Sequence, residues 1–197
     1  NCSFNVISLS ILIGSNKSHK YIQIPSDFCK IRERNIKVIT KKLSSEVYTA
    51  IEKVCNKSAY SKFLLFLSCY SILIAKLSDS YQFEVMTPEF LTEIPEKRYL
   101  LLPIKIDKDI TLKEQLLVIA DTVEEMKKHD AADLPMLMNQ MEIDSKSYRF
   151  GISSSDLHCS SSIAYMDNQY FLHYNLNIIR DELELNYDSS YFQEETA

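Results

Sequence analysis

The sequence has 197 residues, of which 46% are hydrophobic and 25% charged, a composition typical of a globular domain. Its two glycines, Gly14 and Gly151, lie too far apart to build a Gly-rich phosphate loop. The net charge of −5, without any Lys/Arg run, makes a nucleic acid an unexpected partner. Five irregularly spaced cysteines argue against a disulfide framework and favour a reduced, cytoplasmic compartment.

The first 35 residues are expected to form a lead-in connector, followed by one domain over residues 36–197. The apolar run at 4–13 is too short to span a bilayer, and its Val, Ile and alternating Ser suit a strand or an ordered linker. The sequence begins Asn-Cys-Ser without an initiator Met, so we expect an excised segment of a longer chain. Alternating apolar and polar residues at 35–43 then predict a strand.

Two helices are predicted next. Ser44 is a good N-cap for the first, whose apolar face consists of Val47, Ile51, Val54 and Cys55. Ser58 or Ser61 would cap the second. Residues 63–77 are apolar almost all round, which predicts a helix buried in the middle of the domain, with Cys69 as a small core residue.

Two strands and a second pair of helices are expected after that. The strands cover 83–86, ending at Thr87-Pro88, and 99–106, where Pro103 marks an edge or a bulge. Thr111 would cap a long amphipathic helix with the buried stripe Leu112, Leu116, Ile119, Val123 and Met126. Asp133 would cap a short helix with Pro135 in its first turn.

From residue 147 onward the pattern favours strands at 147–155, 161–167, 169–179 and 182–188. Arg180-Asp181 separates the last two strands and suggests a tight hairpin, and residues 191–197 suggest the start of a helix. This mixed order predicts an α/β fold: a two-layer sandwich in which a mixed β-sheet is covered by helices.

The histidines give no support for a helical zinc site, because none stand at HxxxH or HExxH spacing. His129-Asp130 could be an acid–base pair, but a histidine at the end of a helix is favoured by the helix dipole alone, and we prefer that interpretation. No metal site is expected.

Ser153, Ser154 and Ser155 raise the hypothesis of a hydrolase with His158 or His173. The GxSxG nucleophile motif is missing, and serines on a strand commonly satisfy backbone groups or face solvent. We therefore expect no catalytic residue in this chain, and favour one or two of these serines as groups that line a polar tunnel.

Residues 42–88 resemble the second half of a nonribosomal peptide synthetase condensation domain. The family pattern there is a helix start, a buried apolar helix and a strand ending in Gly-Thr-Pro, and the matching positions are Leu67, Tyr70, Leu73, Leu77 and Thr87-Pro88, with Met86 in place of the glycine. Residues 100–135 are similar to the next family segment, with matches in order at Leu102-Pro103-Ile104, Asp107, Leu112, Leu116, His129, Asp133, Leu134 and Pro135. Upstream, Pro25 and Asp27 resemble the family's connector, and residues 182–197 resemble its closing segment.

The resemblance implies a chloramphenicol-acetyltransferase-like fold, in which two similar lobes form a V and amide bonds form in a tunnel between them. Carrier proteins would feed that tunnel with thioesters on phosphopantetheine arms, so this chain itself is expected to bind no cofactor. Thr87, Ser153, Ser154 and Ser155 are the expected tunnel-lining residues. His129 matches a structural histidine of the second lobe.

The family's catalytic motif, HHxxxDG, belongs to the first lobe, and this sequence has neither the His pair nor the Asp-Gly. We therefore expect a second lobe that is not catalytic alone and acts as a docking or structural module for carrier proteins or neighbouring domains. The alternative is a fragment of an active condensation domain whose motif lies in the missing lobe. A single lobe would also expose an apolar seam, so self-association is expected, with no membrane partner. An unrelated small-molecule-binding α/β domain is a third hypothesis, favoured by any fold that lacks a mixed sheet with two long helices.

Overall fold

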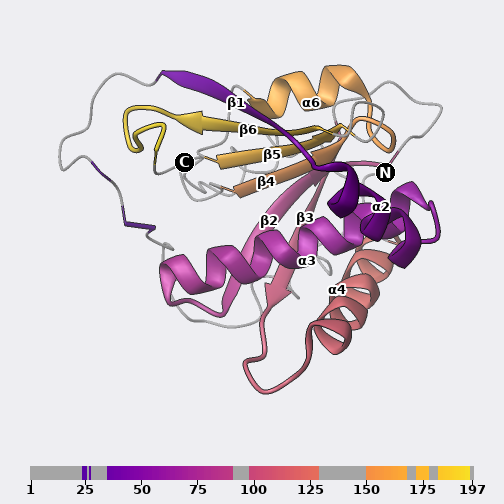
Figure 1. The fold of residues 1–197 in the computed structure, drawn as a ribbon. Helices are drawn as coiled ribbons and strands as arrows, with labels where there is room; N and C mark the ends of the chain where they lie inside the picture. The colour runs from indigo at the N-terminus through magenta and orange to yellow at the C-terminus, as the bar shows by residue number, and fades with distance from the viewer. Residues whose placement is uncertain are drawn as a thin grey trace, which may run out of the picture.

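The computed structural model describes residues 24–25, 27, 35–90, 98–128, 150–167, 172–177 and 182–195. Within these residues, six strands form one sheet in the order β1-β6-β5-β4-β2-β3 (Figure 1). The strands, in chain order, are β1 (Ile36–Lys42), β2 (Gln82–Pro88), β3 (Tyr99–Lys105), β4 (Phe150–Ser154), β5 (Leu172–Asn177) and β6 (Glu182–Asp188).

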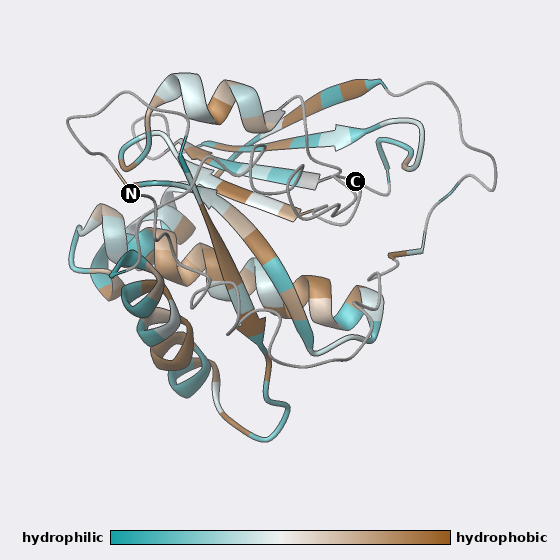
Figure 2. Cartoon of the chain, turned by 180° about the vertical axis from the view of Figure 1, so that it is seen from behind, coloured by the Kyte–Doolittle hydropathy of each residue, from teal (hydrophilic) through white to brown (hydrophobic). Residues whose placement is uncertain are grey.

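The sheet is mixed. β4 runs parallel to its neighbours β2 and β5, whereas the pairs β1·β6, β5·β6 and β2·β3 are antiparallel. β3 is an edge strand, largely hydrophobic along its length (Figure 2), and it carries the expected Pro103. An edge strand tolerates proline because one side of its backbone has no ladder partner.

Four helices accompany the sheet in the described residues: α2 (Ser45–Val54), α3 (Ala59–Ser78), α4 (Leu112–Lys127) and α6 (Ser160–Asp167). The long helices α3 and α4 cover one face, and α6 lies toward the opposite face (Figure 1). Met166 of α6 is fully buried there against Met86, Tyr99 and Leu101. The α/β class and the mixed sheet covered by helices are thus confirmed, and the third hypothesis loses its support.

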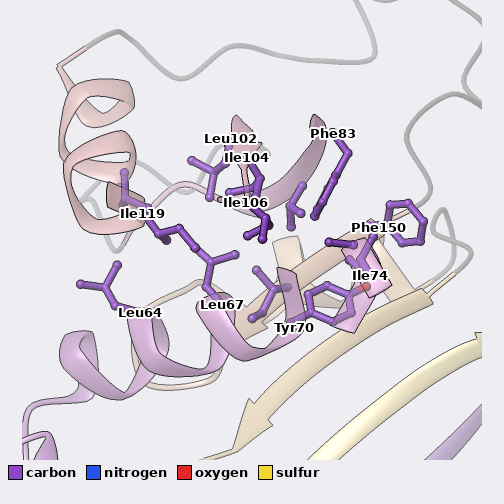
Figure 3. Packing of buried hydrophobic residues seen from close by; sticks show 14 of the residues in the cluster. Leu64, Leu67, Tyr70, Ile74, Phe83, Leu102, Ile104, Ile106, Ile119 and Phe150 are labelled. Carbon is purple, nitrogen blue, oxygen red and sulfur yellow. The ribbon is translucent and has the colours of Figure 1, made fainter. Parts of the chain in front are cut away.

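The main core lies between α3, α4 and the sheet. Leu67 and Ile74 of α3 are at most 1% exposed and point toward the strands, where Leu102 is fully buried (Figure 3). Phe63 of the same helix is fully buried in this cluster as well. Ile119 of α4 reaches the same core from the side. A side chain of this size gains about 1.5–3 kcal/mol on full burial, so this layer supplies much of the stability.

Three predicted helix starts are confirmed. The side chain of Ser44 accepts a hydrogen bond from the Val47 N–H, and Ser58 caps α3 in the same way. Thr111 and Glu114 form a reciprocal capping box at the start of α4. Each cap satisfies backbone N–H groups that the first helical turn leaves without partners.

The predicted strand at 161–167 is wrong, because these residues form helix α6. Ile163 and Met166, three residues apart, are its buried apolar side chains, as expected on one face of a short helix. The helix predicted from residue 191 is also absent from the described residues 191–195, which form turns and irregular structure.

The prediction that α3 is buried all round is wrong along one side. Cys69 is exposed rather than a core residue, and Leu73 and Leu77 are 44% and 46% exposed. A helix lying on a sheet buries one face fully, so the apolar residues at the side of that face stay in contact with solvent.

Two predicted apolar faces are also more open than expected. Helix α2 buries none of its residues, and Val47 and Val54 are exposed, although Cys55 at its end is buried. Leu112, in the first turn of α4, is 47% exposed, whereas Ile119 and Val123 of the same stripe are buried.

The described part of the lead-in meets the end of the chain. Ile24 packs against the cluster around Tyr187, and Asp27 N–H donates to the Tyr191 carbonyl at 2.9 Å. The Gln193 N–H in turn donates to the Asp27 carboxylate. The boundary between residues 35 and 36 stays a prediction. The expected strand at 4–13, the pair His129-Asp130 and the short helix at Asp133 lie outside the described residues.

Among the described residues, α3 alone is long and apolar enough to cross a membrane by length and composition. Half of its most apolar stretch is buried inside the fold, where it packs on the sheet.

Candidate functional site

Strand β4 is an inner strand of the sheet, and the serine run predicted as a candidate site, residues 153–155, lies at its end. Successive side chains of a strand point to opposite faces. Phe150 and Ile152 pack into the core beneath α3, so Ser154 shares that face and Ser153 lies on the other. The serine run is therefore divided between two buried polar clusters, one on each face of the sheet.

His158 is the centre of the cluster on the α3 face. Its Nδ1 accepts a hydrogen bond from the Ser154 N–H at 2.8 Å, and its Nε2 lies 3.3 Å from Thr87 Oγ1. Because Nδ1 faces a backbone donor, the proton of the neutral ring sits on Nε2, which donates to Thr87. The rings of Phe63 and Phe90 flank the imidazole, with centroids 5.3 and 5.0 Å away.

Burial governs the charge of His158, which is 2% exposed. The loss of hydration lowers the pKa of this imidazole from 6.5 to about 3, so the ring is neutral at physiological pH. A neutral, enclosed histidine with both nitrogens engaged is not placed to exchange protons with a substrate. Its contacts join the end of β2 to the turn after β4.

Ser153 and His173 belong to the cluster on the opposite face. Asn175 Nδ2 donates to the Glu184 carboxylate at 2.9 Å, which orients the amide so that its Oδ1 faces Ser153. The Ser153 hydroxyl donates to that oxygen at 3.0 Å. His173 Nε2, 2.8 Å from Ser153 Oγ, must therefore be the donor in their contact.

The direction of the hydrogen bond between His173 and Ser153 is the reverse of the one that a nucleophilic serine needs. An activating histidine accepts the hydroxyl proton, whereas His173 donates to Ser153 and the serine proton is held by Asn175. Both Ser153 and His173 are fully buried. The hydrolase hypothesis is thus unsupported: the structure does bring a serine and a histidine together, but as part of a closed hydrogen-bond network.

The four predicted tunnel residues do not share one surface. Thr87, Ser153 and Ser154 are fully buried and Ser155 is half-buried. Thr87 and Ser154 lie with His158, whereas Ser155 Oγ is 3.5 Å from Asn175 Oδ1. Ser154 Oγ is buried without a hydrogen-bond partner among the described residues. Whether any of them lines a tunnel stays a prediction.

Asn175 and Glu184 were missed by the sequence reasoning, although a signal was present. Polar residues alternate with apolar ones along both β5 and β6, and the antiparallel register places Asn175 directly opposite Glu184. An antiparallel alignment of these two strand sequences predicts a polar stripe on one face of the sheet. Within the described residues no cluster of three His, Cys, Asp or Glu side chains could hold a metal ion.

The fold of this chain is similar to that of several solved structures. No protein-family model and no curated protein matches the sequence. Among solved structures, the cyclization-docking bidomain of the EpoB nonribosomal peptide synthetase from Sorangium cellulosum aligns with a TM-score of 0.63 and 13% identity, over 87% of this chain and 40% of that one. The condensation domain of the monacolin K polyketide synthase MokA aligns with a TM-score of 0.63 and 15% identity, over 81% and 43% of the two chains.

A third similar structure is the complex of the X-domain and OxyB from teicoplanin biosynthesis, with a TM-score of 0.69, 12% identity and coverage of 96% of this chain and 48% of that one. The chain thus has the fold found in condensation and cyclization domains of nonribosomal peptide synthetases, as the resemblance predicted. It spans less than half of each of these three structures, the size of one of two lobes.

Proposed function

We propose that this chain is the second lobe of a condensation-type domain from a nonribosomal peptide synthetase or hybrid polyketide assembly line, and that it acts as a docking or structural module. The observation that carries the proposal is the state of His158 and His173, the two histidines among the described residues. His158 and His173 are buried and committed to hydrogen bonds within the lobe. A lobe built in this way offers neither imidazole to an acceptor amine, and its sequence has no HHxxxDG motif.

The alternative is that the chain is part of an active condensation domain that joins a carrier-bound thioester to an amine. The missing lobe would then bring HHxxxDG, and this lobe would supply one wall of the tunnel. The coverage of less than half of each neighbour is compatible with this alternative as well. The two proposals differ in whether a first lobe, when added, gives amide formation together with this chain.

The expected partners are carrier proteins and adjacent assembly-line domains. A carrier would present its phosphopantetheine arm, and this chain would bind no cofactor of its own, in keeping with a cytoplasmic biosynthetic assembly. Two of the similar structures support partners of this kind by what they contain: one is joined to a docking domain, and the other is a complex with OxyB.

A titration followed by NMR tests the docking role. The isotope-labelled chain is titrated with a candidate carrier protein, once with and once without its phosphopantetheine arm. Saturable amide shifts that gather on one surface are expected in both titrations, because docking uses the carrier surface rather than the arm. An unrelated protein of similar size and net charge is the control. The carrier is added to tenfold excess, because a free concentration of about nine times Kd occupies about 90% of the sites. The absence of shifts with both forms of the carrier would overturn the docking role.

Adding a separately purified first lobe that carries HHxxxDG tests the alternative. Amide product that requires both lobes would support the fragment of an active enzyme. The structural module predicts no product in that mixture.

Self-association is the last part of the proposal. Several large apolar side chains are exposed, including Val54 at 76%, Val38 at 58% and Leu117 at 55%. Apolar residues exposed singly are normal on a protein surface, so self-association is proposed from the apolar seam that a single lobe is expected to expose. A monodisperse monomer by light scattering would contradict self-association and leave the docking role unaffected.

A further inference from the structure

A cavity of about 220 Å³ lies between α3 and the sheet, and its described lining contains no residue of the two polar clusters. One wall comes from α3, through Cys69, Tyr70 and Leu73. The floor comes from Leu176 of β5 and Leu183 of β6, which face each other across the antiparallel pair. The described lining of the cavity therefore comes from elements of this one chain.

The lining of the cavity is almost entirely apolar. Tyr70 and Tyr174 meet edge to face at its inner end, with ring centroids 4.9 Å apart, and present ring surface to the space. Asp, Glu, Lys, Arg and His are all missing from its described lining. A charged ligand would lose its hydration there without compensation, so the cavity selects uncharged molecules.

The size of the cavity limits the ligand further. An apolar cavity of roughly 150 Å³ stays dry and takes up benzene or xenon. A volume of about 220 Å³ has room for one aromatic ring with a short alkyl substituent, and is too small for a peptide helix.

The cavity also has an entrance. Cys69 and Leu73 line the space and are also exposed to solvent. A small molecule can therefore reach the cavity beside these two residues, while Tyr70 and Ile152 connect its lining to the main core.

We infer that this cavity is a binding site for compact, uncharged apolar molecules of the size of an alkylbenzene. The inference is independent of the proposed docking function, since it rests on α3, β5 and β6 within one lobe. A molecule that fills the space removes apolar surface of the lining side chains from water and gains dispersion contacts with them.

Toluene and ethylbenzene are the probes, with benzoate as the charged control. Methyl NMR of the 197-residue chain should show saturable shifts for Ile152, Leu73, Leu176 and Leu183, with a Kd on the order of 10⁻⁴–10⁻³ M. Benzoate should shift none of these methyl groups at the same concentration.

Leu73→Trp and Leu77→Trp form a matched pair of variants. The two leucines lie one turn apart on α3 and are 44% and 46% exposed, but only Leu73 lines the cavity. Leu73→Trp should weaken toluene binding at least about tenfold, equivalent to about 1.4 kcal/mol, whereas Leu77→Trp should leave it unchanged.

The thiol of Cys69 gives a second readout that does not depend on a variant. Saturating toluene should slow alkylation of Cys69 several-fold and leave alkylation of Cys159, which lies outside the cavity, unchanged. The inference is overturned if the methyl groups show no saturable shift, or if both thiols are affected equally. Equal loss of toluene binding in the two tryptophan variants would also overturn the inference. Dissociation of an oligomer in Leu73→Trp would overturn it as well, because a second copy of the chain would then be the occupant of the cavity.

Discussion

Replacing His158 by Asn should remove a specific pH dependence of stability. Asn keeps a hydrogen-bond acceptor close to the position of Nδ1, where the Ser154 N–H donates, but it does not titrate. In the folded protein, burial lowers the pKa of His158 from 6.5 to about 3. Between these two pKa values the unfolded chain binds a proton that the folded chain does not. The free energy of unfolding therefore falls as the pH falls through this window.

The size of the effect follows from the two pKa values. Between about pH 7 and pH 5 the unfolded state gains most of one proton, which costs the folded protein about 2 kcal/mol through His158 alone. At about pH 5 this figure hardly depends on the folded pKa, because His158 stays neutral in the folded protein there for any folded pKa up to about 4.

Urea unfolding of the wild type and His158→Asn at about pH 7, 6 and 5 measures the difference. At neutral pH the variant should be less stable, since it loses ring contacts with Phe63 and Phe90. The difference in the free energy of unfolding between the two proteins should shrink by about 2 kcal/mol at about pH 5. There the unfolded wild type is stabilised by protonation of His158, and the unfolded variant is not. A gap that stays constant within about 0.5 kcal/mol would refute the neutral, buried imidazole.

Three further substitutions, two of them with a matched control, test other parts of the fold by the same urea assay. Leu67→Ala should cost about 2–5 kcal/mol because this side chain of α3 is fully buried against the sheet, whereas Leu77→Ala, at a half-exposed position, should cost less than about 1 kcal/mol. Thr111→Ala removes the capping box of α4 and should cost about 1 kcal/mol; a change below about 0.3 kcal/mol would contradict the cap. Ser153→Ala leaves its histidine and asparagine partners unsatisfied and should cost about 1–3 kcal/mol, while Ser155→Ala, which makes only a 3.5 Å contact, should cost much less. Equal losses for the two serines would contradict the buried network.

The sequence was sufficient for features that depend on neighbours along the chain. Ser44, Ser58 and Thr111 cap helices in the structure as their side chains and positions predicted. Pro103 lies on an edge strand for the reason expected, the missing N–H. These are local effects, in which a residue acts on backbone groups three or four positions away.

Features set by distant contacts were harder to predict. Residues 160–167 form a helix whose Met166 packs against Met86 of β2 and Tyr99 and Leu101 of β3, a contact that the short apolar run alone does not reveal. Cys69 and Leu73 belong to an apolar helix, yet they are exposed because the sheet covers only one side of α3. In both cases tertiary packing decided the outcome.

The candidate site shows the same division. The serine run at the end of β4 was identified from the sequence, but its separation onto two faces follows from the alternation of the strand. The partners of these serines come from other strands or from the turn after β4: His173 and Asn175 from β5, and His158 after the turn. Only the strand order and register bring those residues together.

The most direct test of the central claim is a condensation assay with the purified chain and two carrier proteins, one loaded with an acyl or peptidyl thioester and the other with an aminoacyl thioester. Intact-protein mass spectrometry would follow transfer of the acyl group onto the amine. A lone second lobe with buried histidines predicts no product above the reaction without the chain. Amide formation by the chain alone, lost in a variant of one of its own histidines, would contradict the account.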